Sequence, residues 1–499
     1  MLVTSEFSTL LTLLVKATFI YFIAINSIQL ILILIAWIQL KIEPLVLHRA
    51  LYYRLLKSKS LPPITIIMPA YNEGATIVRA TKYLLFAEYP LKEVIVVNDG
   101  SDDDSIPQLI KAFSLHRIPV ATNDKLPSMP VKALYRSQIY PTLLVIDKER
   151  GGKSDALNVG IGQATTPYIC TIDADSLLEN DALIKIALPA LTSKKQTDAV
   201  GGVVRLVKGT SGRIGRIESV SAPKERIHLI QALEYLRAFI FGRLGFSAMN
   251  ALLIISGAFG LFRRDLLIKV GGFRIDQLGE DMELILRFHE NLAKSKVHYS
   301  IRLVPDTVCW TVTPSTISAL HIQRRRWQMG LAQALWTHKG MFLNPRNKLA
   351  GLFAFPYYVI LELFGPFFEL FAYLVLPLVL IFGIIDVRIT SYLLLAMIWY
   401  TISVSLLTIS IEQLMIPRFQ RVRDLMLIAW GAVLEVFLYR PLNHLWRVEA
   451  MFGILFAGRK SKTMKQWHVS PLTEYPSKSR DYRYNEEQEG TTKIRDQIK

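Results

Sequence analysis

Four long apolar stretches constrain most strongly what this chain can fold into. Each holds about 20 mostly apolar residues, which is the length a helix needs to cross a bilayer. They lie at residues 17–40, 366–385, 391–411 and 425–442. The first is too long for the apolar region of a signal peptide, and no small-residue cleavage site follows it. The sequence therefore predicts an integral, multi-pass membrane protein that retains its first helix as an anchor.

Basic residues flank these stretches and account for the net charge of +17. Those after the first stretch are Lys41, His48, Arg49, Arg54, Lys57 and Lys59, and those in a later loop are Arg418, Arg421 and Arg423. Positive charge marks the cytoplasmic side and contacts lipid headgroups, so we expect a cytoplasmic domain on a bacterial inner or plasma membrane. No nucleic-acid-binding motif accompanies the charge, and we expect no nucleic-acid partner.

The number of crossings leaves one conflict. One span before the large domain and three after it would put the basic tail, residues 458–499, outside the cell. Its charge argues for the inside. Two alternatives remain open: residues 349–364 contain a further crossing, or one of the four stretches lies in the interface.

Residues 61–314 have the composition of a cytoplasmic α/β domain. Apolar, β-branched runs at residues 64–68, 93–97, 142–146 and 168–172 alternate with helical patterns, which predicts an open, mostly parallel sheet. The remaining units are an anchor with a basic linker (1–60), a helix at the membrane surface (315–348), a transmembrane bundle (349–457) and the polar tail. Residues 226–248 also suit helices at the membrane surface, although ordinary helices packed on the sheet are the alternative. The two cysteines, Cys170 and Cys309, are isolated and suit a reducing compartment.

Open sheets of this kind bind ligands beyond the carboxyl ends of their strands, and polar residues follow several of the predicted strands. Pro69 ends the first strand, and Asn72 is a suitable N-cap for a helix that starts near Glu73. Asp99 follows the second strand, where its carboxylate could accept hydrogen bonds from a base or ribose. The acidic residues after it, Asp102, Asp103 and Asp104, suit the N-terminus of the next helix.

Two further turns carry charges suited to a diphosphate. Lys153 opens a helix directly after two glycines, in RGGKSDALNVG, without the spacing of a P-loop. Asp173 and Asp175 follow the strand at 168–172 and share a face of an extended chain. Two carboxylates so placed can bind Mg²⁺ or Mn²⁺, which would bridge them to a diphosphate.

Three later segments complete the set of candidates. ISGAFG, with Ser256 and Gly257, suggests a backbone bend close to a ligand. In GED, Glu280 and Asp281 begin an amphipathic helix, and one of them could take a proton from an acceptor hydroxyl. In HIQRRRWQMG, the residues Gln323, Arg326 and Trp327 share a helix face and suit phosphate and a sugar ring. Arg324 and Arg325 point elsewhere, and we interpret them as headgroup contacts.

Taken in order, the motifs PAYNE, NDGS, GGKSDALN, DAD, SGAFG, GED and QRRRW resemble those of the membrane-bound, processive glycosyltransferases of family 2. Cellulose, chitin, hyaluronan and poly-N-acetylglucosamine synthases belong to this group, and SGAFGLFRRD is most similar to the last of these. The resemblance covers about residues 20–460. It implies a Rossmann-like, nucleotide-sugar-binding domain of the GT-A type and inversion at the anomeric carbon.

The resemblance also implies roles for individual residues. Pro69, Ala70, Tyr71, Glu73 and Asp99 would hold the uridine, and Lys153 would lie near the donor phosphates. Asp173 and Asp175 would bind the donor and the metal, with Asp175 the direct ligand. Asp281 would be the general base beside Glu280, and Ser256 and Gly257 would line the acceptor site. Gln323, Arg326 and Trp327 would hold the diphosphate and the acceptor end.

Two departures concern the substrate rather than the reaction: Gly279 stands where the family usually has threonine, and SGAFG replaces the cysteine-containing motif of cellulose synthases. We favour a UDP-sugar-dependent synthase that elongates and exports a β-linked polymer of the N-acetylglucosamine or glucose type, with accessory export subunits among its partners. A non-processive enzyme that glycosylates a membrane lipid such as ceramide is the alternative. A non-enzymatic membrane scaffold or transport subunit is a third interpretation, for which charges within the spans, chiefly Glu362, Glu369 and Glu435, would argue.

Overall fold

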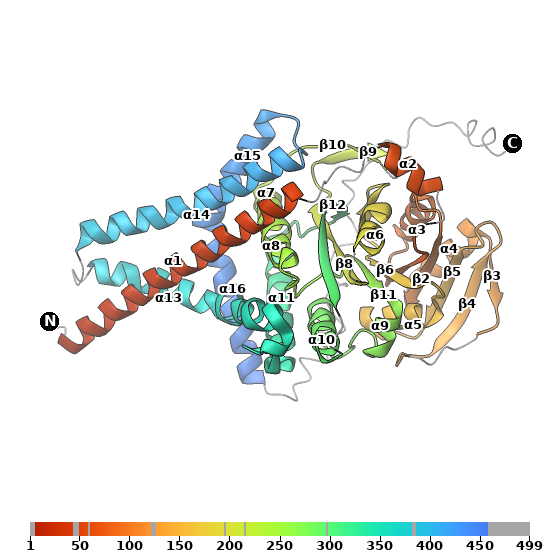
Figure 1. Ribbon diagram of the computed structural model, residues 1–499, viewed down its shortest axis with the longest axis horizontal. Coiled ribbons are helices and arrows are strands. Elements are labelled where there is room, and N and C mark those ends of the chain that lie inside the picture. The colour runs from red at the N-terminus through yellow and green to blue at the C-terminus, as the bar shows by residue number, and fades with distance from the viewer. Residues whose placement is uncertain are drawn as a thin grey trace.

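The computed structural model joins a broad α/β domain to a bundle of long helices that projects from one side (Figure 1). It describes residues 5–42, 49–57, 60–120, 126–193, 196–213, 216–295, 298–381 and 386–457. His48, Lys59 and the tail 458–499, for which the sequence suggested a cytoplasmic location, lie outside these residues.

A ten-stranded mixed sheet forms the α/β domain, in the order β3-β4-β5-β2-β1-β6-β11-β8-β12-β7. The strands are β1 (Ile64–Ala70), β2 (Lys92–Asp99), β3 (Leu115–Ile118), β4 (Val131–Ser137), β5 (Leu143–Lys148), β6 (Tyr168–Ile172), β7 (Leu177–Leu178), β8 (Gln196–Leu206), β11 (Phe259–Arg263) and β12 (Tyr299–Thr311). A separate hairpin joins β9 (Thr210–Arg213) to β10 (Arg216–Val220). The four strands predicted from sequence are β1, β2, β5 and β6, which pair in parallel at the centre. The predicted open, mostly parallel α/β fold is confirmed.

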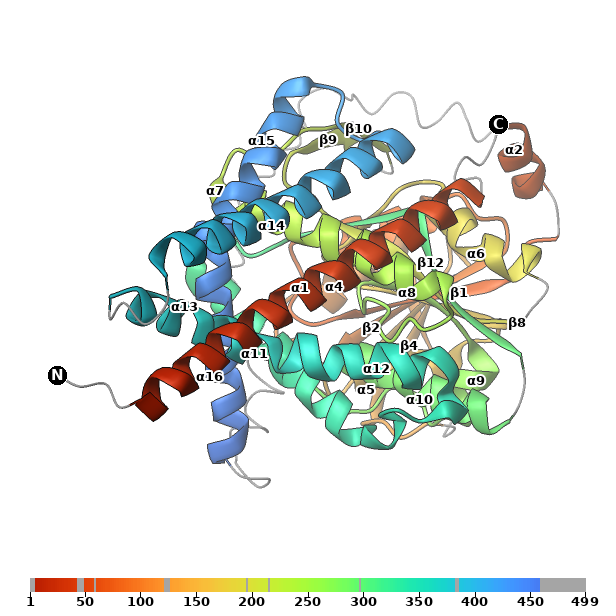
Figure 2. The ribbon, with the colours of Figure 1, turned by 60° about the vertical axis from the view of Figure 1, so that its left-hand side comes forward.

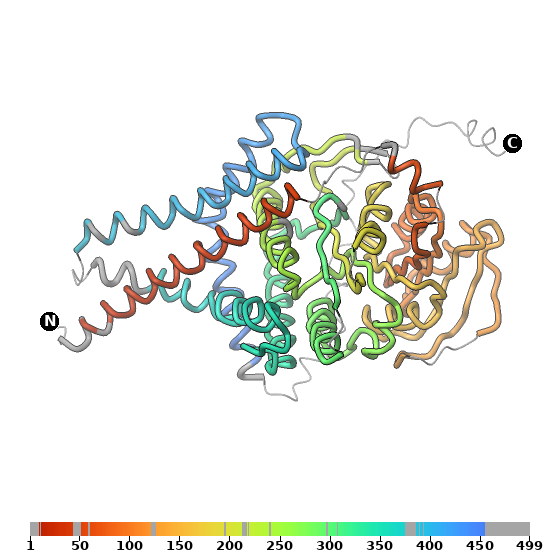
Figure 3. The backbone as a smooth tube through the Cα atoms, in the orientation of Figure 1, coloured from red at the N-terminus to blue at the C-terminus, as the bar shows by residue number. Residues whose placement is uncertain are grey.

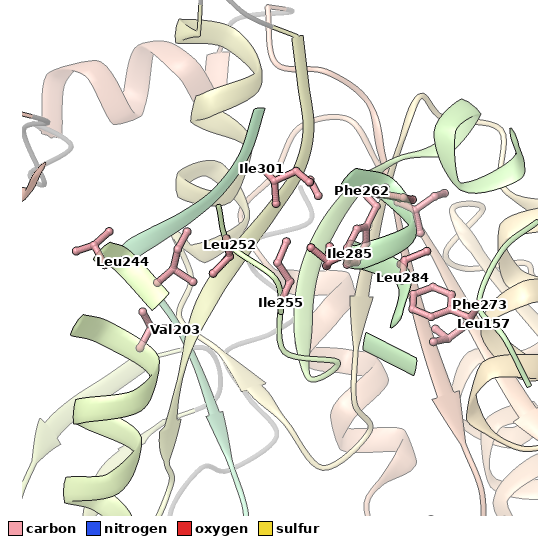
Figure 4. Packing of buried hydrophobic residues seen from close by; sticks show 14 of the residues in the cluster. Leu157, Val203, Leu244, Leu252, Ile255, Phe262, Phe273, Leu284, Ile285 and Ile301 are labelled. Atoms are coloured by element: carbon pink, nitrogen blue, oxygen red, sulfur yellow. The ribbon is translucent and has the colours of Figure 1, made fainter. Parts of the chain in front are cut away.

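Two layers of helices cover the faces of the sheet. One face is covered by α3 (Ile77–Phe86), α4 (Ser105–Phe113) and α6 (Ala182–Thr192), whose apolar side chains pack with those of β1 and β2. The other face is covered by α5 (Lys153–Gln163), α9 (Arg264–Lys269) and α10 (Glu280–Lys294). The second layer continues into the bundle, because Leu157 and Ile285 belong to the same buried cluster as Ile33 of α1 (Ser5–Ile42) and Val404 of α14 (Val387–Met415). Figure 4 shows part of this cluster.

The chain between β10 and β11 connects the sheet to the bundle. It forms α7 (Arg226–Tyr235), the π-helical segment η1 (Leu236–Gly242) and α8 (Arg243–Ala248). α7 packs on β8 and α15 (Val422–Leu434), while α8 packs on β12 and α1 (Ser5–Ile42). A side chain at Gly245 would lie 2.8 Å from the carbonyl oxygen of Leu32, so α8 and α1 are in close contact. The packed-helix alternative therefore describes residues 226–248 better than a helix lying freely on the membrane.

Four helices of the described chain are long and apolar enough to cross a membrane: Leu11–Ile42, Ala350–Leu374, Thr390–Met415 and Val422–Ile454. The second begins with η4 (Ala350–Ala354), α12 (Phe355–Tyr357) and η5 (Tyr358–Leu363), and it continues into α13 (Gly365–Ile381). Residues 349–364 are thus the start of this candidate span and not a further crossing. The others correspond to α1, to α14 (Val387–Met415), and to α15 followed by η6 (Glu435–Tyr439) and α16 (Arg440–Ala457).

Every glutamate that the sequence singled out in the spans has a basic partner. Glu362 pairs with Arg447 at 3.4 Å, Glu369 with His444 at 2.7 Å, and Glu435 with Arg237. A fourth acidic residue, Glu412 on α14, pairs with Arg205 on β8. Two of these partners, Arg205 and Arg237, come from the α/β domain and its connecting helices, so these pairs attach the bundle to the domain that it carries.

Candidate active site

The loop after β1 is organised by the loop after β2. Asn72 takes a left-handed conformation (φ 54°), its backbone N–H donates to Ser101 Oγ at 2.9 Å, and its side-chain oxygen accepts from the N–H of Asp102 at 3.0 Å. The prediction that Asn72 caps the following helix is therefore wrong, since α3 starts only at Ile77. Asn72 instead locks two loops together at the carboxyl edge of the sheet.

The predicted uridine-binding residues lie in and after the end of β1. Pro69 and Ala70 are its last two residues, and the ring of Tyr71 is covered by the guanidinium of Arg150 at 4.1 Å. Glu73 follows, and burial together with the nearby carboxylates of Asp103 and Asp173 raises its pKa.

The acidic run after β2 does more than stabilise a helix. Asp103 accepts from the backbone N–H of Ser105 at the start of α4, at 3.1 Å, and also from that of Gly74 at 2.8 Å. Asp104 accepts from the side chain of Gln108, and Asp102 lies 3.5 Å from the Tyr71 hydroxyl. Only Asp103 binds the first turn of α4 as expected, and it ties that helix to the loop after β1.

Asp99, the last residue of β2, is buried and holds the glycine loop that precedes Lys153. Its two carboxylate oxygens accept from the backbone N–H groups of Gly151 at 2.9 Å and Gly152 at 2.7 Å. The buried ammonium of Lys148 lies 2.6 Å from Asp99 and equally far from Asp155. Lys148 and Asp155 were not found from the sequence, and their contacts give Asp99 a role in shaping the loop.

Lys153 occupies the centre of the site. It opens α5 as predicted, pairs with Asp173, donates to the carbonyl of Gly257 at 3.3 Å, and lies 4.0 Å from Glu280. Burial alone would lower its pKa, but the carboxylates of Asp173 and Glu280 reverse the effect and raise it. A permanently charged lysine between three chain segments can therefore meet a phosphate without losing its proton.

Asp173 and Asp175 lie in the turn after β6, as the spacing predicted. Part of Asp175 is exposed to solvent, but many protein atoms surround its carboxylate. This burial, together with the charges of Asp173 and Glu73, raises its pKa to about 7. Within the described residues no group of three or more histidine, cysteine or acidic side chains has the geometry of a complete metal site. Mg²⁺ needs only one or two carboxylates when substrate phosphates and waters supply its other ligands. Crowded carboxylates of this kind fit such a cation.

The GED segment brings a carboxylate to the SGAFG segment. Asp281 accepts from the backbone N–H of Gly257 at 3.2 Å and from that of Met282 at 2.8 Å. The neighbouring Glu280 is largely buried, and burial and the charge of Asp281 raise its pKa against the opposing effect of Lys153. Ser256 stands next to Gly257 just before β11. The structure thus brings together the candidate base, the candidate acceptor loop and Lys153.

Two glycines set the distance between α10 and α11 (Ile317–Thr337). A Cβ atom on Gly279 would lie 3.0 Å from the carbonyl carbon of Gly330, and one on Gly330 would lie 2.9 Å from the backbone nitrogen of Gly279. Contacts this short require glycine on both sides. Gly279, which departs from the usual threonine, therefore allows α11 to approach the start of α10.

The QRRRW segment lies on α11, and of its three candidate residues Arg326 interacts with a residue of the Lys153 cluster. Arg326 acts electrostatically on Glu280, and the half-exposed ring of Trp327 lies 6.3 Å from that of Tyr235. Gln323 has a buried side-chain oxygen with no hydrogen-bond partner among the described residues. Of these three groups, Arg326 is connected with the Lys153 cluster, and the roles of Gln323 and Trp327 stay predictions.

The interpretation of Arg324 and Arg325 as headgroup contacts is wrong. Arg324 is buried, pairs with Glu234 at 2.6 Å, donates to the Tyr439 hydroxyl at 2.8 Å, and covers the Trp327 ring at 4.2 Å. Arg325 pairs with Glu449 at 3.1 Å. Arg324 therefore holds Trp327 in place, and helical spacing alone gave no sign of this.

Arg243, the first residue of α8, is a further group near the candidate base. Its guanidinium is close enough to Asp281 for the two charges to attract each other. The sequence showed arginines within residues 226–248 but gave no reason to select this one.

Comparison with known proteins finds relatives among glycosyltransferases. A curated poly-beta-1,6-N-acetyl-D-glucosamine synthase of Staphylococcus epidermidis is 28% identical over 303 residues, which are 59% of this chain and 62% of that protein. The enzyme of the same name from Staphylococcus aureus strain COL is 26% identical over 302 residues, 60% of each. The match thus spans about three-fifths of the length of these curated relatives. Among solved structures, a mannosyltransferase from Pyrobaculum calidifontis in complex with GDP-Man and Mn²⁺ gives a TM-score of 0.47 at 18% identity, covering 88% of this chain and 99% of that one.

The family match covers the whole sheet of the α/β domain and α11 as far as Gly330. The sequence model of the family described as "Glycosyltransferase like family 2" matches residues 62–330, which include every motif from PAYNE to QRRRW. This chain belongs to glycosyltransferase family 2.

Proposed function

We propose that this chain transfers a sugar from a UDP-sugar to an acceptor hydroxyl, with inversion at the anomeric carbon. The observation that carries the proposal is the convergence of Lys153, Asp173, Gly257 and Asp281, from four separate segments, at the carboxyl edge of the sheet. The ammonium group of Lys153, which can bind a diphosphate, therefore lies close to the carboxylate of Asp281, which can accept a proton.

The transfer is a direct displacement. The acceptor oxygen forms a bond to the anomeric carbon while the bond from that carbon to the β-phosphate oxygen breaks, and UDP leaves with the electron pair. Asp281 accepts the hydroxyl proton; the N–H groups of Gly257 and Met282 hold its carboxylate in position. Lys153, Arg326 and Gln323 stabilise the charge that develops on the diphosphate.

A divalent cation, Mg²⁺ or Mn²⁺, would be held by Asp175, with Asp173 beside it. When bound, it neutralises negative charge on the leaving diphosphate. Asp173 is paired with Lys153, so donor binding would exchange this contact for contacts of both groups with the phosphates. Tyr71, Glu73 and the loop that Asp99 shapes would surround the base and ribose.

We further propose that the product is a β-linked polymer of the N-acetylglucosamine or glucose type. Support comes from the poly-beta-1,6-N-acetyl-D-glucosamine synthases among the relatives and from the long apolar helices beside the site. Under this proposal residues 61–314 form a cytoplasmic catalytic domain, residues 315–348 carry the acceptor-side motif, and residues 349–457 provide the membrane bundle. Accessory export subunits would act on the other side of the membrane.

One observation favours the alternative of a lipid acceptor. A mainly apolar pocket lies between β8, α7 and the loop before α15, and its lining includes Leu206, Tyr235, Trp310 and Phe419. Because Tyr235 also contacts Trp327, an acyl chain in this pocket would leave its headgroup near the acceptor zone.

The test is incubation of the purified full chain with a panel of radiolabelled UDP-sugars and Mg²⁺ or Mn²⁺, followed by analysis of product size. A long, hydrolase-sensitive polymer supports the synthase, and a single labelled glycolipid supports the alternative. We expect Asp281→Asn to reduce transfer by about a hundredfold or more while UDP affinity stays nearly unchanged. Asp276→Asn, an exposed aspartate five positions earlier that pairs with Arg274, is the matched control and should remain active. Full activity of Asp281→Asn would refute the assignment of the base.

A further inference from the structure

We propose that the fourth apolar helix, residues 422–457, does not cross the membrane but lies along its surface and binds lipid through one exposed apolar stripe. This helix comprises α15, η6 and α16. The proposal concerns how the protein is seated on the bilayer and does not depend on the chemistry of the catalytic site.

The exposed face of this helix is mainly apolar, although Arg423 and Glu449 are also exposed. Met426 is 67% exposed, Trp430 55%, Phe437 56% and Leu445 49%. The complete stripe is Val422, Met426, Trp430, Phe437, Leu438, Leu445 and Phe452. Most of these positions follow one another at intervals of four, seven or eight residues, so they share one side of a helix.

The opposite face carries most of the charges, and the protein covers it: Asp424 and Glu435 are buried, whereas Arg423 and Glu449 remain exposed. Glu435 pairs with Arg237, Arg447 donates to Gln328 at 2.7 Å, and Glu449 pairs with Arg325. In a helix exposed to water the charged face would point outward. Here most of the charged side chains point inward and a mainly apolar face is left outside, so we infer that the medium beyond the stripe is not water.

The direction of the helix argues against a fourth span. α1, α13 and α14 project from the α/β domain in a common direction, whereas α15–α16 runs across it in both views (Figures 1 and 2). The tube drawing shows the same crossing at the base of the bundle (Figure 3). α16 packs along α11 and contacts α13. A bilayer crossed by α1, α13 and α14 would therefore present its surface to the length of α15–α16.

Lipid is the occupant that these observations favour. Apolar side chains are also exposed on the neighbouring spans, among them Ile20 and Ile23 on α1 and Trp399 on α14, so the stripe adjoins a surface that already requires a bilayer. An apolar helix face at the boundary between headgroups and acyl chains buries about 5–10 Å deep. This arrangement also resolves the conflict over the tail, because three crossings leave the end of α16 on the side of the catalytic domain.

Site-directed spin labelling of the full chain in phospholipid nanodiscs tests the proposal. Single cysteines replace Met426, Leu438, Leu445 and Phe452, which are not buried, while the native Cys170 and Cys309 are buried. Substitutions at exposed sites should not disturb folding, and monodisperse elution in size-exclusion chromatography checks that each variant is folded. Label depth is measured from relaxation by oxygen and by a water-soluble nickel chelate. Cysteines at Tyr392, Trp399, Leu407 and Leu414 on α14 form the matched series for a helix that crosses.

We expect the four labels on α15–α16 to lie at one shallow depth, and those on α14 to pass through the bilayer centre. In a crossing helix, depth changes by about 1.5 Å per residue, so Met426 and Phe452 would differ by about 40 Å. A depth gradient of that kind on α15–α16 would overturn the proposal. Labels that are protected from both oxygen and the nickel chelate would overturn it as well, because protein, such as a second copy of the chain, would then cover the stripe.

Discussion

The carboxylate of Asp175 shares its surroundings with those of Asp173 and Glu73, and burial is the main cause that raises its pKa to about 7. The acid form does not bind a hard cation. We therefore expect the affinity for Mn²⁺ to fall as the pH is lowered through 7, by about tenfold per unit below that value. Calorimetric titration of the full chain with Mn²⁺ between about pH 6 and pH 8 measures this directly. Asp175→Asn should bind Mn²⁺ weakly at every pH. An affinity for the native chain that does not vary with pH would contradict the role of Asp175.

The close contact between Gly279 and Gly330 leads to a second prediction, which concerns the effect of a single substitution on kcat. Gly279→Ala would place a methyl group 3.0 Å from the backbone of Gly330, so α10 would shift and displace Asp281 from the acceptor loop. A displacement of about 1 Å at a reacting group costs about a hundredfold in rate. We expect kcat to fall by about tenfold or more with little change in donor affinity.

Gly340→Ala is the matched control for this substitution. A Cβ atom there would meet no atom within 4 Å, so the variant should keep its activity. If Gly279→Ala and Gly340→Ala behave alike in kcat, the close approach of the helices does not position the base.

Individual elements show where sequence reasoning succeeds. The four predicted strands are found at β1, β2, β5 and β6, because their short β-branched runs are buried on both faces. Helices α5 and α10 begin at Lys153 and Glu280 as expected. β11 was not predicted: its first residues overlap the SGAFG motif, which suggested only a bend. β8 and β12 were also missed, since glycines interrupt one and Pro305 the other, and their pairing with each other and with β11 and β7 stabilises them.

The ends of α10 and α11 are joined by a histidine between two glutamates. His338 is buried and lies 3.2 Å from Glu283 and 3.0 Å from Glu290. Burial lowers its pKa, but the hydrogen bonds that the protonated ring donates to both carboxylates outweigh burial, and the pKa is raised. A raised histidine pKa gives stability that is complete below the unfolded value of 6.5 and is lost as the pH rises through the folded value.

We therefore expect the unfolding temperature of the native chain to fall between about pH 6 and pH 9 more steeply than that of His338→Gln. At low pH the substitution should cost about 1.5–3 kcal/mol, the range for hydrogen bonds to charged groups. Thermal unfolding in detergent measures both effects. The exposed His116→Gln should follow the native curve, and equal slopes for all three proteins would rule out this contribution.

Across the whole molecule, the sequence predicted the position of the residues that follow the parallel strands better than the position of α11 against α10. Asp99, Lys153 and Asp173 follow neighbouring parallel strands, whose carboxyl ends must meet at one edge. Nothing comparable fixes α11 against α10, because that contact depends on two glycines far apart in sequence. The inward direction of Arg324 could not be predicted for the same reason, because its partners, Glu234 and Tyr439, come from distant segments.

The loop between α14 and α15 gives the sidedness of the bundle. Arg418, which the sequence assigned to a basic cytoplasmic loop, pairs with Glu179 at 2.8 Å and Asp306 at 3.0 Å, just beyond the turn that carries Asp173 and Asp175. This loop must therefore lie on the same side of the membrane as the α/β domain, whichever side that is.

We expect a cysteine at Arg421 to react with a membrane-impermeant maleimide from the same side as one at Lys82, on the exposed surface of α3. A cysteine at Val387, where α14 begins at the far end of the bundle, should react only from the opposite side. Labelling of intact cells and of inverted vesicles compares the two sides. Reaction of positions 421 and 82 from opposite sides cannot be reconciled with the ion pairs of Arg418. Reaction of all three positions from one side would mean that α14 does not cross the bilayer. The proposal that α15–α16 lies along the membrane surface would then lack the crossing helix with which it is compared.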